Sequence, residues 1–86
     1  MPKALTVQRT LVIPPDRERF HERMLRKREH YAQAKCRYWV VEEASLPGAF
    51  LEFFEAPDAE TLTRAHEASP ERVLDPRRIY SEVELP

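Results

Sequence analysis

The first part of the chain carries apolar and β-branched side chains at a period of two. This pattern covers residues 4–13 and ends at the pair Pro14-Pro15. A period of two with several β-branched residues predicts a strand. Three later stretches have the same character, with aromatic or β-branched residues bounded by turn residues: 36–43, 49–55 and 78–85. Four strands are therefore expected.

Residues 16–35 have the period of a helix instead. They contain no Gly or Pro, and Phe20, Met24 and Tyr31 lie along one stripe of the predicted helix. Asp16 is the candidate N-cap. The opposite surface is expected to be charged and solvated, and it carries Arg19, Glu22, Arg23, Arg26, Lys27 and Glu29.

A second, shorter helix is predicted for residues 59–68, with Asp58 as its N-cap. Residues 69–77 contain two prolines and predict a loop. The resulting order is β-α-β-β-α-β. Right-handed crossovers fold that order into a four-stranded antiparallel sheet with both helices on one face, an α+β ferredoxin-like architecture. With 86 residues, the chain has room for a single domain over residues 1–86.

Both faces of the predicted sheet carry large apolar side chains. Leu51 and Phe53 point away from Phe50 and Phe54, and Trp39 alternates with its neighbours in the same way. Two helices cover only one face, so the other would leave an exposed apolar patch, which usually marks an interface. A homodimer joined sheet to sheet is expected. The alternative is a monomer with a few exposed aromatics.

Composition removes several classes of function. The net charge is −1, so there is no overall attraction to nucleic acid, and the arginine-rich first helix also carries glutamates that can pair with its arginines. The single cysteine, Cys36, excludes an internal disulfide and a cysteine-rich zinc site. No His pair has metal-ligand spacing, so neither a metal nor another cofactor is expected. The apolar runs are too short for a membrane span and no signal peptide is evident, so a cytoplasmic location is expected.

Glu52 is the first candidate for acid–base chemistry. It lies between Phe50 and Phe54 on one strand face, and burial there would raise its pKa and suit it as a general base. Gln8 and Arg9 are its candidate partners, and Arg9 would form an ion pair with it if the strand register allows. The simpler interpretation is that Glu52 or Arg9 reaches solvent at a sheet edge.

His66 is the second candidate, because imidazole titrates near neutrality. A histidine that caps the last helical turn or packs at the dimer edge would look the same in the sequence. The wall of a ligand pocket would come from Phe50, Phe54 and Trp39, with His21 at its edge. Whether helix two and Glu52 share one face of the sheet is open at this point.

Residues 37–69, RYWVVEEASLPGAFLEFFEAPDAETLTRAHEAS, resemble the dimeric α/β-barrel superfamily, in particular the antibiotic-biosynthesis-monooxygenase-like domains. The matching features run in the order of that family: an aromatic strand, a Pro-Gly turn, a strand with Glu and aromatics, an acidic cap and a Leu-x-x-x-His helix. They are Tyr38, Pro47-Gly48, Glu52 with Phe53 and Phe54, Asp58, and Leu62 to His66. The resemblance implies two sheets packed into a barrel, with a pocket in or beside each sheet, and it places His66 there.

Two departures separate this chain from that family. Phe53 stands where Trp is frequent, and Ser69 is followed by Pro70-Glu71 where a second His is frequent. The chain also has no Asn, which disfavours the haem-degrading branch.

These observations predict a small homodimer that binds a small aromatic or hydrophobic molecule. It would be a monooxygenase or isomerase without a cofactor or, alternatively, a non-catalytic binding or structural module; an RNA-binding ferredoxin-like domain is the less favoured rival. An enzyme should show a closed pocket on which Glu52, His66 or His21 converge. A structural module should show aromatics packed across the interface and no cavity.

Overall fold

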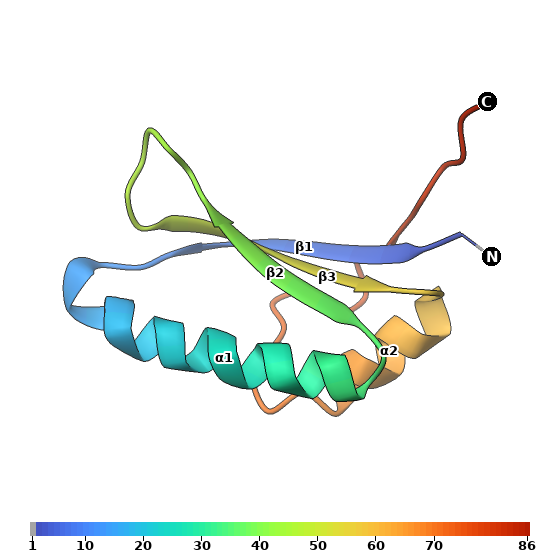
Figure 1. Ribbon diagram of the computed structural model, residues 1–86, viewed down its shortest axis with the longest axis horizontal. Coiled ribbons are helices and arrows are strands. Elements are labelled where there is room, and N and C mark those ends of the chain that lie inside the picture. The colour runs from blue at the N-terminus through green and yellow to red at the C-terminus, as the bar shows by residue number, and fades with distance from the viewer. Residues whose placement is uncertain (1) are drawn as a thin grey trace.

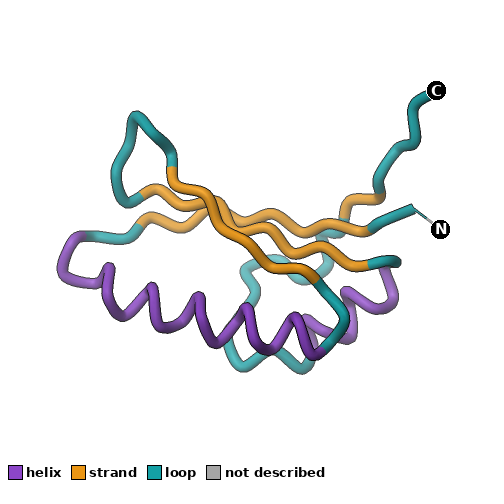
Figure 2. Tube along the Cα trace, in the orientation of Figure 1, coloured by secondary structure: helices purple, strands orange, loops and turns teal. Residues whose placement is uncertain are grey.

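The computed structural model describes residues 2–86. The strands are β1 (Ala4–Leu11), β2 (Arg37–Glu42), β3 (Ala49–Ala56) and β4 (Tyr80–Ser81). The helices are α1 (Arg17–Gln33) and α2 (Ala59–Glu67), and a 3₁₀ turn, Pro14–Asp16, leads into α1. The predicted element order is confirmed. Residues 69–77 form the predicted loop, which runs from the end of α2 past α1 and back to the sheet (Figure 2).

The four strands form one antiparallel sheet in the order β2-β3-β1-β4. β3 lies between β1 and β2, and β1 lies between β3 and β4. Each helical connection therefore crosses over one intervening strand, an arrangement compatible with a ferredoxin-like fold. Both helices lie on the same side of the sheet (Figure 1). The prediction of two helices on one face is confirmed.

The fourth strand is much shorter than predicted. Only Tyr80 and Ser81 pair with β1, against an expected strand over 78–85, and one further bond joins Glu82 N–H to the Lys3 carbonyl. Residues 82–86 instead leave the sheet on the side away from the helices (Figure 1).

The turn between β2 and β3 depends on the only glycine of the chain. Gly48 has φ +92°, a conformation that favours glycine, and its N–H donates to Glu42 Oε2 at 2.9 Å. Its carbonyl accepts from Val12 N–H at 2.7 Å, so the turn is tied to the segment after β1. β2 and β3 thus form an antiparallel hairpin, and its turn packs too closely for a side chain at position 48.

One of the two predicted helix caps is present. The Asp58 carboxylate accepts from Thr61 N–H at 2.7 Å and caps α2 as expected. Asp16 makes no capping hydrogen bond, because the 3₁₀ turn continues directly into α1 and leaves Asp16 with helical dihedrals. An N-cap normally has extended dihedrals, which aim its side chain back at the first free N–H groups.

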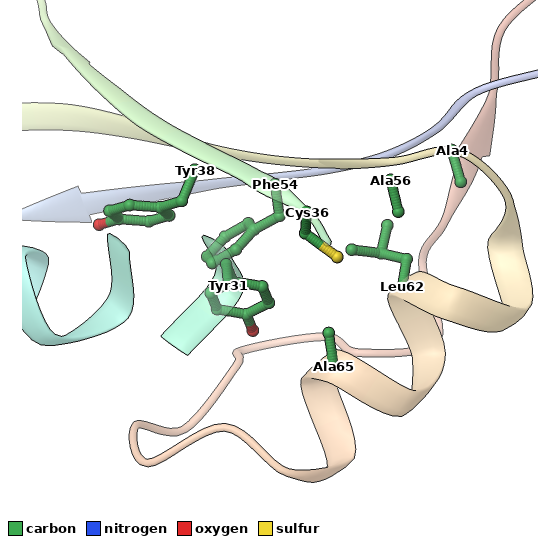
Figure 3. Packing of buried hydrophobic residues seen from close by; sticks show 8 residues of the cluster. All are labelled: Ala4, Tyr31, Cys36, Tyr38, Phe54, Ala56, Leu62 and Ala65. Atoms are coloured by element: carbon green, nitrogen blue, oxygen red, sulfur yellow. The ribbon is translucent and has the colours of Figure 1, made fainter. Parts of the chain in front are cut away.

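The core lies between the helices and the sheet. Tyr31 of α1 and Leu62 of α2 are fully buried against Phe54 of β3 and Tyr38 of β2 (Figure 3). Cys36 is buried in the same cluster, as expected for a structural cysteine, and burial raises the pKa of its thiol.

No segment of residues 2–86 covers the opposite face of the sheet (Figure 1). Beside the charged residues Arg9, Arg37 and Glu55, apolar and aromatic residues at alternate positions point to it from all four strands: Leu5, Val7, Trp39, Val41, Leu51, Phe53 and Tyr80. All of them are half-buried or exposed, and the rings of Trp39 and Phe53 stack at 5.0 Å between centroids. The prediction of large apolar side chains on both faces is confirmed. We call this surface the open face.

Candidate functional site

A buried carboxylate with four donors lies at the middle of β3, on the helix-covered side of the sheet. Glu52 is 0% exposed. Its Oε2 accepts from Lys27 Nζ and from the Tyr38 hydroxyl, each at 2.7 Å. Its Oε1 accepts from Gln8 Nε2 and Thr10 Oγ1, each at 3.1 Å. Two carboxylate oxygens offer about four acceptor positions, so all of them are in use.

Strand register explains how these donors meet. Gln8 lies directly opposite Glu52 across the β1–β3 ladder, and Tyr38 is two residues along β2 from Val40, the cross-strand partner of Glu52. Cross-strand and diagonal neighbours of one face come within side-chain reach of each other. Gln8 as a partner of Glu52 is therefore confirmed.

Lys27 reaches Glu52 from α1, so the prediction that it lies on the solvated surface of that helix is wrong. Its side chain is 4% exposed. The spacing contained the missed signal: Phe20, Met24, Lys27 and Tyr31 follow one another by four, three and four residues, which is one face of a helix. The charge of Lys27 suggests an exposed side chain, but its place in this spacing indicates the buried face of the helix.

The electrostatics of Glu52 differ from the prediction. Burial alone would raise the pKa of Glu52, as expected, but Lys27 and the hydrogen bonds from Tyr38 and Gln8 outweigh it and lower that pKa below its ordinary value. Burial raises the pKa of the Tyr38 hydroxyl, and the hydrogen bond to Glu52 and its charge raise that pKa further. Glu52 is thus ionised near neutral pH, with no acceptor position free for a substrate proton.

His66 forms a second buried polar group on the same side of the sheet. Its ring nitrogens lie 2.8 Å from Thr6 Oγ1 and 2.7 Å from the Tyr31 hydroxyl. Burial, and to a lesser degree the charge of His30, lower the pKa of His66 to about 4. The ring is neutral at pH 7, so it accepts a hydrogen bond from one hydroxyl and donates to the other. His66 and Glu52 do share one side of the sheet.

The loop of residues 69–77 lies against this polar layer. The Leu74 N–H donates to Gln8 Oε1 at 3.0 Å, so Gln8 links the loop to Glu52. The loop curls around a hollow of about 430 Å³ that is bordered by His66. The loop side chains that line this hollow are Ser69, Pro70, Glu71, Arg72, Val73, Leu74 and Pro76. We call it the loop hollow.

Two other predicted site residues, His21 and Trp39, lie together but not in the loop hollow. His21 and Trp39 border a hollow of about 270 Å³ between α1 and β2, together with Met24 and Leu25. This volume is below the roughly 300–1,000 Å³ typical of ligand pockets, whereas the loop hollow lies inside that range.

The remaining predictions for the site are corrected by the strand register, because alternate residues of a strand point to opposite faces of the sheet. Arg9 points to the open face and pairs with Glu43 at 2.7 Å, so the expected ion pair with Glu52 does not form. Trp39 also points to the open face, while Phe50 and Phe54 point to the helices. The three aromatics therefore cannot form one pocket wall.

Phe50 and Phe54 are separated on their own face as well. Phe50 packs against Phe20 at 4.9 Å between ring centroids, and Phe54 packs against Tyr31 at the same distance, with Glu52 between them along β3. His30 of α1 is half-buried, and its Nε2 donates to the Ala65 carbonyl at 2.8 Å.

Over residues 2–86, no three His, Cys, Asp or Glu side chains gather where they could hold a metal ion. In the same part of the chain, neither helix combines the length and the apolar character needed to cross a membrane.

Comparison with known proteins finds no family model, no curated protein and no solved structure that matches this chain.

Proposed function

We propose that this protein is a homodimeric α/β-barrel binding module, and that each subunit holds a small aromatic or hydrophobic molecule in the loop hollow. The observation that carries the ligand site is His66, a predicted site residue, at the border of a hollow of about 430 Å³. Half of its lining is apolar, namely Pro70, Val73, Leu74 and Pro76. An apolar wall with a few polar groups is the usual composition of a small-molecule site.

The open face supports the homodimer. It presents aliphatic and aromatic side chains from every strand, and in a monomer these would stay in water. A second copy packed sheet to sheet would cover them and form the barrel of the antibiotic-biosynthesis-monooxygenase-like domains. The helices and the loop lie on the other side of the sheet, so such a dimer leaves the loop hollow accessible (Figure 1).

A non-catalytic module is the better supported of the two classes. A cofactor-independent monooxygenase or isomerase would need Glu52 or His66 free to exchange a proton with a substrate. All acceptor positions of Glu52 are occupied, and both nitrogens of His66 have partners within the chain. We include no nucleic acid among the partners, because the net charge is −1.

The dimer is tested by light scattering of two variants with matched exposure. Val41 on the open face is 43% exposed, and Leu25 on α1 is 42% exposed. The wild type should show about twice the 10.2 kDa of one chain. Val41→Glu should give a folded monomer, since a buried charge without a partner is costly, and Leu25→Glu should stay dimeric. A monomeric wild type, or equal behaviour of both variants, would contradict the sheet-to-sheet dimer.

The ligand site is tested by NMR shift mapping with benzoate and benzamide as aromatic probes. At least one probe should shift the resonances of Val73 and His66. Leu74→Glu should abolish these shifts, and Ile13→Glu should leave them intact, because both residues are 62% exposed but only Leu74 lines the hollow. If neither probe shifts these resonances, or if both variants behave alike, the loop hollow is not the binding site.

A further inference from the structure

Few contacts hold the loop of residues 69–77 to the body of the protein. It contains no helix or strand, and Pro70 and Pro76 lie near its two ends. Its attachments are the buried side chain of Val73, the bond from Leu74 N–H to Gln8, and the carboxylate of Glu71. Segments with so few bonds open at low free-energy cost.

Glu71 sits in a site built for a carboxylate. Its Oε2 lies 3.3 Å from Arg23 Nε and its Oε1 lies 3.1 Å from Arg26 Nη2, so two guanidinium groups each bind one oxygen. Arg23 and Arg26 are three residues apart on one face of α1. Partial burial alone would raise the pKa of Glu71, but the two arginines bring it below its ordinary value. Guanidinium pairs of this kind recognise the carboxylate group itself, whatever molecule carries it.

The arginine pair remains reachable from solvent. The side chain of Glu71 is only 17% exposed, whereas those of Arg23 and Arg26 are 44% and 56% exposed. The apolar part of the loop hollow, with Val73 and Leu74, adjoins Glu71 in the same lining. Glu71 therefore connects the apolar space of the hollow with the arginine pair.

We propose that the ligand of the loop hollow is a small organic carboxylate with an apolar or aromatic body, and that Glu71 is a built-in competitor for its carboxylate site on Arg23 and Arg26. Binding exchanges one carboxylate for another, releases Glu71 to water and moves the loop of residues 69–77 away from Gln8. This inference rests on the proposed ligand site and adds its chemical class. Because the exchange conserves the charge at the arginine pair, the apolar body provides the net gain on binding.

The test compares benzoate with benzamide, its neutral analogue, on the wild type and two variants. Glu71→Gln removes the competing charge, and Glu67→Gln makes the same change at an exposed glutamate of α2. Benzoate should bind Glu71→Gln at least about fivefold more tightly than the wild type, since an internal competitor lowers the fraction of free sites. Glu67→Gln should match the wild type, and Glu71→Gln should not raise the affinity for benzamide, because the neutral amide does not compete with Glu71 for the arginines.

A measurement on the wild type keeps the test independent of the stability of the variants. Hydrogen exchange of the Leu74 amide should become faster when benzoate binds, because the bond to Gln8 breaks. Slower exchange would overturn the movement of the loop. A benzoate affinity that Glu71→Gln does not raise would overturn the competitor role, while shifts at Val73 would still support the hollow as a site. If neither probe binds, the proposed function itself fails.

Discussion

Lys27→Met is the substitution that tests the buried ion pair most directly. Met has about the length of the Lys side chain and keeps its apolar contacts, but it removes the positive charge 2.7 Å from Glu52. The carboxylate would then remain in a site with 0% exposure, with only the neutral donors Tyr38, Gln8 and Thr10.

Removing one partner of a buried pair costs about 3–5 kcal/mol, because the other charge stays buried without compensation. A domain of this length has about 4–13 kcal/mol of stability in total. The variant should therefore lose about a quarter or more of its free energy of unfolding. With a urea dependence of about 1 kcal/mol per molar, the midpoint should fall by about 3–5 M, or the variant should be unfolded in buffer.

Urea titration followed by fluorescence of Trp39, the only tryptophan, measures this change at one fixed protein concentration. Lys3→Met is the control, because Lys3 pairs with Glu55 at 3.8 Å with its side chain 61% exposed. A surface pair of this kind contributes about 0–1 kcal/mol. The double variant with Lys27→Met and Glu52→Gln should lose much less free energy of unfolding than the two single variants lose in sum.

The pH dependence gives a second view of the same pair. The lowered pKa of Glu52 contributes stability above its ordinary pKa, and this contribution is lost as the pH falls through the lowered value. Without Lys27, burial raises that pKa instead, so the gap between wild type and variant should narrow as the pH falls towards 4. A Lys27→Met variant that loses no more stability than Lys3→Met would refute the described pair.

Two further predictions concern single residues. In the folded protein the pKa of His66 is lowered to about 4, against an ordinary value of 6.5. Its contribution to the free energy of unfolding should therefore be full above pH 6.5 and fall by about 3 kcal/mol as the pH drops towards 4. His66→Gln should flatten this part of the curve of stability against pH, and an unchanged slope would contradict the lowered pKa. Gly48→Ala should destabilise by about 1–3 kcal/mol in thermal melts, because φ is +92° and the new Cβ would lie 2.5 Å from the Val12 carbonyl oxygen; a melting temperature equal to that of the wild type would show that this turn tolerates a side chain.

Local chemistry determined the element order before any tertiary information. Residues 4–13 and 49–55 have the period of strands, 16–35 have the period of a helix, and Asp58 is placed to cap the second helix. These signals depend only on neighbouring residues and the geometry of one element. They were sufficient for the order of elements, the two helices on one face and the apolar character of both sheet faces.

Strand register decided which side chains belong to the buried layer. Gln8 and Arg9 were equal candidates in the sequence, but only Gln8 has the same parity as Glu52 once β1 pairs with β3. The same rule sends Trp39 to the open face and Phe54 to the core. Register is set by contacts between distant segments, so the period along one strand cannot supply it.

By itself, the sequence determined the elements, their order and the two candidate acid–base residues, Glu52 and His66. Only the tertiary structure decided which charges and hydrogen-bond partners surround these residues. It pairs Lys27 with Glu52, buries His66 between Tyr31 and Thr6, and pairs Glu71 with two arginines of α1. The physical reason is that a pKa depends on the charges and hydrogen bonds within a few ångströms, and here most of those groups lie 25 or more residues away in the chain.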